Sequence, residues 1–118
     1  MTMRVVLRDP QPADDAARSA GAWLKPGVPY DVLEVRAEPG RLVHLRIAGE
    51  QSGTPALFDA ALFDTVDGTI PPHWRARLGP GGTLTLGPAA WAAPGFWEAY
   101  FDDDPDAVAA YERGRAAG

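Results

Sequence analysis

The stretch DDDPD at residues 102–106 places four carboxylates within five positions, and carboxylates can bind metal ions or transfer protons. Its alternate aspartates have the spacing of the first ligands in a calcium-binding loop. The rest of that loop is missing, because its sixth and twelfth positions require glycine and glutamate and are Ala107 and Arg113 here. The sequence therefore predicts neither a metal site nor a cofactor.

The same aspartates have the pattern of a helix start. Asp104 precedes Pro105, so the aspartate would be the N-cap and the proline would occupy the first helical position. The carboxylates of Asp102, Asp103 and Asp106 would lie near the positive end of the helix dipole. We interpret the run as a helix cap, and carboxylates in solvent at a helix start do not indicate acid–base catalysis.

Other residue types that could perform catalysis are sparse. His44 and His73 are far apart in sequence, and neither has a second ligand at the spacing of a zinc site. Ser52 lies in GEQSG, which lacks the G-x-S-x-G order of a nucleophile elbow. The GPGG stretch lacks the lysine and hydroxyl of a phosphate-binding loop, so a tight turn is the simpler interpretation. The sequence does not predict an enzyme.

Composition narrows the class of protein further. The 118 residues suffice for a single domain, residues 1–118, and the absence of cysteine excludes disulfides and thiolate zinc sites. A net charge of −5 disfavours nucleic-acid binding and would attract a basic partner. The apolar run at residues 5–7 is too short for a signal peptide or a membrane span, so we expect a cytoplasmic protein that does not bind membranes.

The elements that would position these residues begin with strands, because residues 1–86 show the period of two that half-buried strands require. Three segments are predicted to turn one face to the core. The core-facing residues are Met3, Val5 and Leu7 in the first segment, Leu33, Val35 and Ala37 in the second, and Val43, Leu45 and Ile47 in the third. The outward positions of the second and third segments are Glu34, Arg36, His44 and Arg46. The turn residues EPG between these two segments predict a hairpin.

Further along, Phe58 and Phe63 are predicted core residues, and Asp67 with Gly68 ends their element. HWRARL and TLTLG flank GPGG and predict a second hairpin. The Ala-, Pro- and Asp-rich segment 9–27 is predicted to be a long loop that could hold a helical turn at residues 13–19. Together these patterns predict one small, bent, barrel-like antiparallel sheet of about five to seven strands.

The chain from residue 87 onward is predicted to be helical, which makes the fold class α+β. GPAAWAAPG forms a short element that the Pro-Gly pair ends, and FWEAYF follows with aromatic residues four positions apart. The last helix would begin after Asp104 and stop at Gly114, with Arg113 in its last turn.

Aromatic residues are concentrated in this helical segment, at Trp91, Phe96, Trp97, Tyr100 and Phe101. Packing on the sheet would bury about three of them, and a short helix cannot bury two adjacent aromatic faces. One or two rings would therefore stay exposed beside the aspartates, and such a combination is typical of protein-binding surfaces. The predicted partner-binding residues are Trp97, Tyr100, Phe101, Asp102 and Asp103.

Three stretches of the chain resemble a group of small, uncharacterised bacterial proteins. They are KPGVPYDVLEV, TPALFDAALFDTVDGTIPPHW and WAAPGFWEAYFDDDPDAVAAYERG. Their pattern is G-x-x-Y-x-V, then LFEVVDGxIPxxW, then FWE with FDGD, and it spans roughly residues 24–113. This chain departs from it at Asp103, where glycine is usual. Some members resemble immunity proteins encoded beside bacterial toxins, and the strand-rich half resembles Src-homology-3-like barrels, which are chiefly binding modules.

We therefore expect a non-enzymatic protein-binding module, most concretely an immunity protein whose acidic, aromatic face neutralises a basic toxin. The alternative from another class is a small hydrolase or ligand-binding enzyme that uses His44 or His73 with a nearby carboxylate. A third possibility is a regulatory or structural β domain with another cellular partner. The sequence predicts no oligomeric state.

Overall fold

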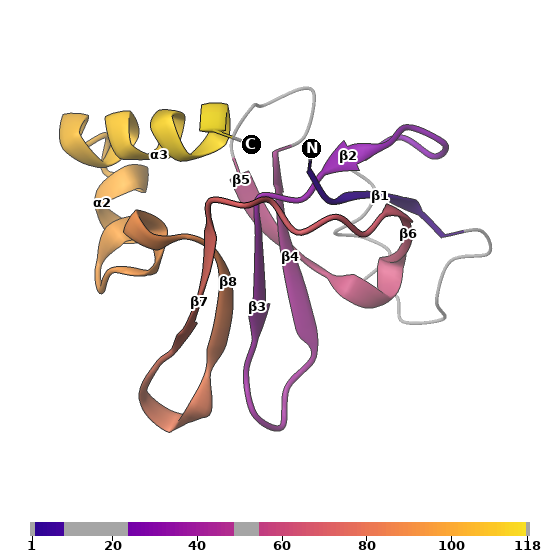
Figure 1. The fold of residues 1–118 in the computed structure, drawn as a ribbon, viewed down its shortest axis with the longest axis horizontal. Coiled ribbons are helices and arrows are strands. Elements are labelled where there is room, and N and C mark those ends of the chain that lie inside the picture. Colours follow the sequence, from indigo (N-terminus) through magenta and orange to yellow (C-terminus); the bar gives the residue numbers. More distant parts are fainter. Residues whose placement is uncertain (1, 9–23, 49–54, 118) are drawn as a thin grey trace.

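The computed structural model describes residues 2–8, 24–48 and 55–117, and in this part of the chain strands precede the α-helices, as expected for the α+β class (Figure 1). The strands are β1 (Arg4–Leu7), β2 (Tyr30–Asp31), β3 (Glu34–Ala37), β4 (Val43–Ala48), β5 (Pro55–Asp59), β6 (Phe63–Asp67), β7 (Trp74–Leu78) and β8 (Leu84–Pro88). The helices are α2 (Phe96–Phe101), α3 (Pro105–Ala117) and the 3₁₀ helices η1 (Ala60–Leu62), η2 (Pro80–Gly82) and η3 (Ala89–Ala92).

The described strands form two antiparallel sheets and not one bent sheet. The smaller sheet has the order β2-β1-β6, and the larger has the order β5-β4-β3-β8-β7. Both predicted hairpins are present, because β3 pairs with β4 and β7 pairs with β8. The hairpins lie side by side, since β8 also pairs with β3. The sheets are not closed into a barrel, so the Src-homology-3-like arrangement stays a prediction.

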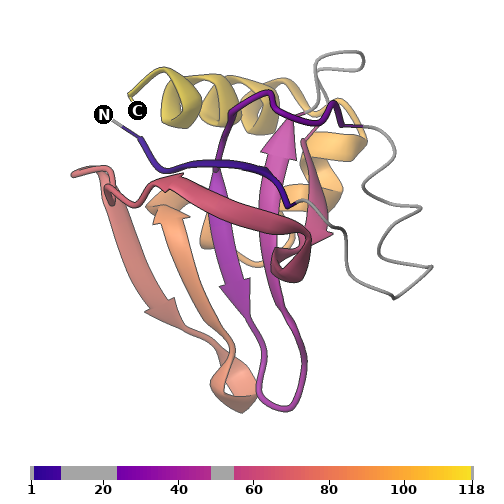
Figure 2. The same cartoon turned by 90° about the vertical axis from the view of Figure 1, so that its right-hand side faces the viewer.

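The five-stranded sheet is the middle layer, with the small sheet on one face and the helical segment on the other (Figure 2). The core between the sheets consists of Val5, Leu24, Tyr30, Val32, Leu45, Ile47, Phe58, Leu62, Phe63 and Trp74. The core under the helices consists of Leu33, Trp91, Phe96, Ala107 and Tyr111. Val5, Leu45, Ile47, Phe58 and Phe63 are buried as the sequence pattern predicted.

Three predictions were wrong, one about the extent of a strand and two about which residues face solvent. The segment YDVLEVRA is not one strand, because β2 belongs to the small sheet and β3 to the large one. Glu34 and Arg46 are buried, with 2% and 4% of their surface exposed, because the helical segment covers the second face of the large sheet. Val43 is 42% exposed on the opposite face, where it was expected to join the core.

The aspartate run caps a helix, as predicted. The backbone N–H of Asp106 donates to Asp104 Oδ1 at 3.3 Å, and the N–H of Val108 donates to the Asp104 carbonyl at 3.0 Å.

The predicted stop at Gly114 was wrong, because α3 continues to Ala117. The helical turn proposed for residues 13–19 lies outside the described residues. Within the described ranges, no helix has the length and apolar character needed to cross a membrane.

Candidate functional site

A buried ion pair of the large sheet lies against the helical segment. Glu34 of β3 lies opposite Arg46 of β4, and Arg46 Nε donates to Glu34 Oε1 at 3.2 Å. Their side chains are only 3% and 5% exposed. The Arg46 guanidinium also lies 3.7 Å from the ring centroid of Trp97, which comes from α2. The pair and the ring together fix where α2 sits on the sheet.

Burial controls the protonation of this pair. Desolvation raises the pKa of the Glu34 carboxyl, although the neighbouring Arg46 acts in the opposite direction. Desolvation likewise lowers the pKa of the Arg46 guanidinium. Gly87 of β8 leaves room for the acid, because a Cβ at that position would lie 3.2 Å from Glu34 Cγ. The site therefore depends on glycine at position 87, which has no side chain, as well as on the two charged residues.

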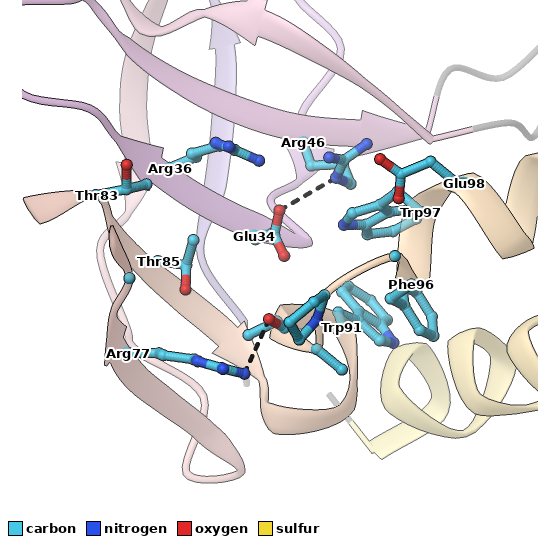
Figure 3. A pocket seen from close by; sticks show the side chains of 15 residues that line it. Glu34, Arg36, Arg46, Arg77, Thr83, Thr85, Trp91, Phe96, Trp97 and Glu98 are labelled. Atoms are coloured by element: carbon cyan, nitrogen blue, oxygen red, sulfur yellow. Dashed lines mark hydrogen bonds and ion pairs between the residues drawn. The ribbon is translucent and has the colours of Figure 1, made fainter. Parts of the chain in front are cut away.

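An open groove of about 520 Å³ lies over this ion pair, between the large sheet and the helical segment (Figure 3). Its sheet side includes Arg36, Arg77 and Thr85, which occupy one cross-strand row. Arg36 forms an ion pair with Glu38 at 3.0 Å, and Arg77 Nη1 donates to the carbonyl of Ala92 at 2.9 Å. The groove thus offers guanidinium and hydroxyl groups, and its lining holds no histidine, serine or cysteine.

The predicted catalytic alternative depends on a histidine near a carboxylate. His44 lies opposite Asp59 in the β4–β5 register, but the Asp59 carboxylate accepts a hydrogen bond from the N–H of Ala61 at 2.8 Å. The ring nitrogens of His73 are shielded from solvent and have no hydrogen-bond partner among the described residues. Neither histidine lines the groove. The described ranges also contain no group of three or more His, Cys, Asp or Glu side chains placed to hold a metal.

The five predicted partner-binding residues lie together where α2 meets α3, and we call them the acidic–aromatic corner: Trp97, Tyr100, Phe101, Asp102 and Asp103. Phe101 is 51% exposed, both aspartates are exposed, and the other two rings are partly buried. The Phe101 ring centroid lies 5.2 Å from that of Tyr100 and 6.1 Å from that of Trp97. An exposed ring therefore sits on two partly buried rings and directly beside two carboxylates.

The rings beneath the corner form a continuous packed cluster. Tyr111 of α3 contacts both Tyr100 and Trp91, with centroid distances of 4.8 Å and 5.2 Å. Trp91, Phe96 and Tyr111 are buried, and burial raises the pKa of the Tyr111 hydroxyl. Of the five rings in the predicted aromatic cluster, two are buried (Trp91 and Phe96), where about three were expected, two are partly buried (Trp97 and Tyr100), and Phe101 is exposed. Asp103 has φ of 60°, a left-handed conformation that favours glycine.

The sequence placed Glu34 and Arg46 on outward strand faces and did not predict that they form a buried ion pair. The signal was available in the hairpin: a turn at EPG places a glutamate of one strand opposite an arginine of the next. Their burial could not be foreseen, because it depends on a helical segment some 60 residues further along the chain.

No protein-family model, no curated protein and no solved structure matches this chain. The function proposed below therefore depends on the geometry of the chain itself.

Proposed function

We propose that this chain is a non-enzymatic protein-binding module and that its partner contacts the acidic–aromatic corner. The exposure of Phe101 carries the proposal: about half of this phenylalanine is in solvent, at the end of an aromatic cluster whose other members are buried or partly buried. Aromatic residues surrounded by polar groups are enriched at the centres of protein–protein interfaces. Asp102 and Asp103 supply such polar groups on the next two positions.

The corner is held in place before any partner arrives. The ion pair of Glu34 and Arg46 lies against Trp97, and the cap at Asp104 fixes the start of α3. A preorganised surface loses little conformational entropy on binding, so more of the contact energy appears as affinity. This rigidity supports a role in recognition.

The partner we propose is basic, and most concretely it is a bacterial toxin that this chain neutralises as a cytoplasmic immunity protein. The net charge of −5 and the two carboxylates at the corner support a basic partner, because complementary fields accelerate association and reject partners of like charge. The toxin itself is suggested by the resemblance of the sequence pattern to toxin-associated proteins.

Comparative capture from the native host would test this proposal. Wild type should retain a basic protein that Asp102→Asn with Asp103→Asn retains poorly, because the two carboxylates are removed from the contact surface. Asp31→Asn with Asp64→Asn is the charge-matched control on β2 and β6 of the small sheet, and it removes only exposed ion pairs with Arg4 and Arg8, which contribute little to stability. Equal loss in both double variants would show that net charge alone governs capture and that the corner has no special role.

A further inference from the structure

The outer edge of β7 is a second surface, on which backbone hydrogen-bonding groups are not paired with another described strand. β7 ends the strand order of the large sheet, and Figure 2 shows no described segment beyond it. All of its residues after Trp74 are exposed. The N–H of Gly79 donates to the carbonyl of Thr83, and hydrogen bonds alternate along an antiparallel ladder. Ala76 and Leu78 therefore turn their backbone N–H and C=O groups outward, where a further strand could pair with them.

The two faces beside this edge differ in chemistry. On the face toward the small sheet, one cross-strand row runs from Val43 through Ala37 and Leu84 to Leu78. Its ends are 42% and 76% exposed, so the row is an apolar strip that the small sheet does not cover. An added strand could extend this strip by one apolar side chain.

The other face of β7 carries cations. Arg75 donates to the carbonyls of Pro72 and Trp74, and Arg77 donates to the carbonyl of Ala92. Neither arginine has an ion-pair partner in the part of the chain that the structure describes. An added strand would place its own alternate side chains beside these two guanidinium groups.

From this arrangement we infer that the β7 edge binds an extended acidic segment of another protein by strand addition. The segment has carboxylates at alternate positions, beside Arg75 and Arg77, with an apolar residue between them. A second copy of this chain is a poor occupant, because antiparallel pairing of two β7 edges would bring arginines against arginines. The net charge of −5 repels an acidic segment only weakly at this edge, since charges farther away than the screening length of about 8 Å are largely screened at physiological salt.

The test is a nuclear magnetic resonance titration with a capped peptide of about seven residues that alternates valine and glutamate. Binding should shift the amide resonances of Ala76 and Leu78 and slow their hydrogen exchange. The same peptide with lysine in place of glutamate should not bind. Absence of glutamate-peptide binding, equal binding of both peptides, or protection confined to other amides would overturn the inference. So would self-association of the free protein through this edge, measured by sedimentation.

Two variants distinguish the contribution of backbone strand pairing from the contribution of the arginine charges. Ala76→Pro removes an outward N–H without removing a β7–β8 hydrogen bond, and it should abolish binding of the glutamate peptide. Arg75→Glu with Arg77→Glu should weaken that binding about tenfold and let the lysine peptide bind instead. Arg113→Glu, an exposed change on α3, is the control and should bind as wild type does. If Ala76→Pro fails to melt cooperatively, unchanged peptide preference in the arginine pair variant still overturns the inference.

Discussion

At the scale of single residues, burial outweighs attraction at the Glu34–Arg46 pair. Both side chains are almost fully removed from water, and the pKa of each is shifted in the direction that favours its neutral form. Taking two charges out of water costs several kcal/mol per ion, so such a pair stabilises a fold weakly. Its position under the Trp97 ring indicates that it serves to locate α2 and with it the corner.

A pH dependence of stability follows from Glu34. Its folded-state pKa is raised above the usual 4.5, so the folded chain holds the proton more tightly than the unfolded chain does. The contribution of Glu34 to the free energy of unfolding is therefore complete below pH 4.5 and is lost as pH rises through the raised pKa. Urea unfolding of wild type and Glu34→Gln across this range should show wild type losing stability relative to the variant. The opposite slope would mean that Arg46 outweighs desolvation.

Gly114 is required by packing. A Cβ there would lie 2.8 Å from Cζ2 and Nε1 of Trp91, a buried ring whose Nε1 donates to the carbonyl of Ala110 at 3.3 Å. Glycine to alanine inside a helix usually stabilises by about 1 kcal/mol, but here overpacking should destabilise by about 1–3 kcal/mol. Thermal unfolding of Gly114→Ala measures the sign. In a Trp91→Phe background the same substitution should become less harmful, and an unchanged cost there would refute the explanation.

At the scale of elements, the cap of α3 gives a prediction of its own. Asp104→Ala should lower the free energy of unfolding by about 1 kcal/mol, because the side-chain acceptor for the N–H of Asp106 is lost. Asp102→Ala, at an exposed position before the cap, should cost only a few tenths of a kcal/mol. Calcium should leave the melting temperature of all three proteins unchanged apart from a general salt effect. A calcium-specific stabilisation would show that the aspartates bind metal.

Local patterns predicted the elements well where the cause is local. The alternation around Leu45 and Ile47, the two hairpin turns and the cap at Asp104 all depend on neighbours in sequence, and all are present. Failures occurred where distant segments decide. Glu34 is buried by helices far along the chain, and Gly114 stays helical because the ring of Trp91 packs against it. The five residues of the acidic–aromatic corner remain a prediction from the sequence, and the structure adds that Phe101 is the exposed ring.

At the scale of the whole molecule, two cores share one sheet. Trp74 lies in the core between the sheets, while Trp91 lies in the core under the helices. Because the five-stranded sheet contributes to both, we expect them to unfold in one cooperative transition. In Trp74→Phe and in Trp91→Phe, the unfolding transition followed by tryptophan fluorescence should have the same midpoint as the transition followed by far-ultraviolet circular dichroism. Separate midpoints within either variant would show that the two cores unfold independently.

If the acidic–aromatic corner binds a protein partner, truncation of its exposed ring should weaken that binding. The measurement is the affinity of the captured partner for Phe101→Ala compared with Ile70→Ala. The two side chains are exposed to nearly equal extents, 51% and 52%, but only Phe101 belongs to the corner. We predict that Phe101→Ala loses about 2 kcal/mol of binding free energy, roughly thirtyfold in Kd, while Ile70→Ala binds as wild type does. Wild-type affinity in a cooperatively folded Phe101→Ala protein would contradict this prediction.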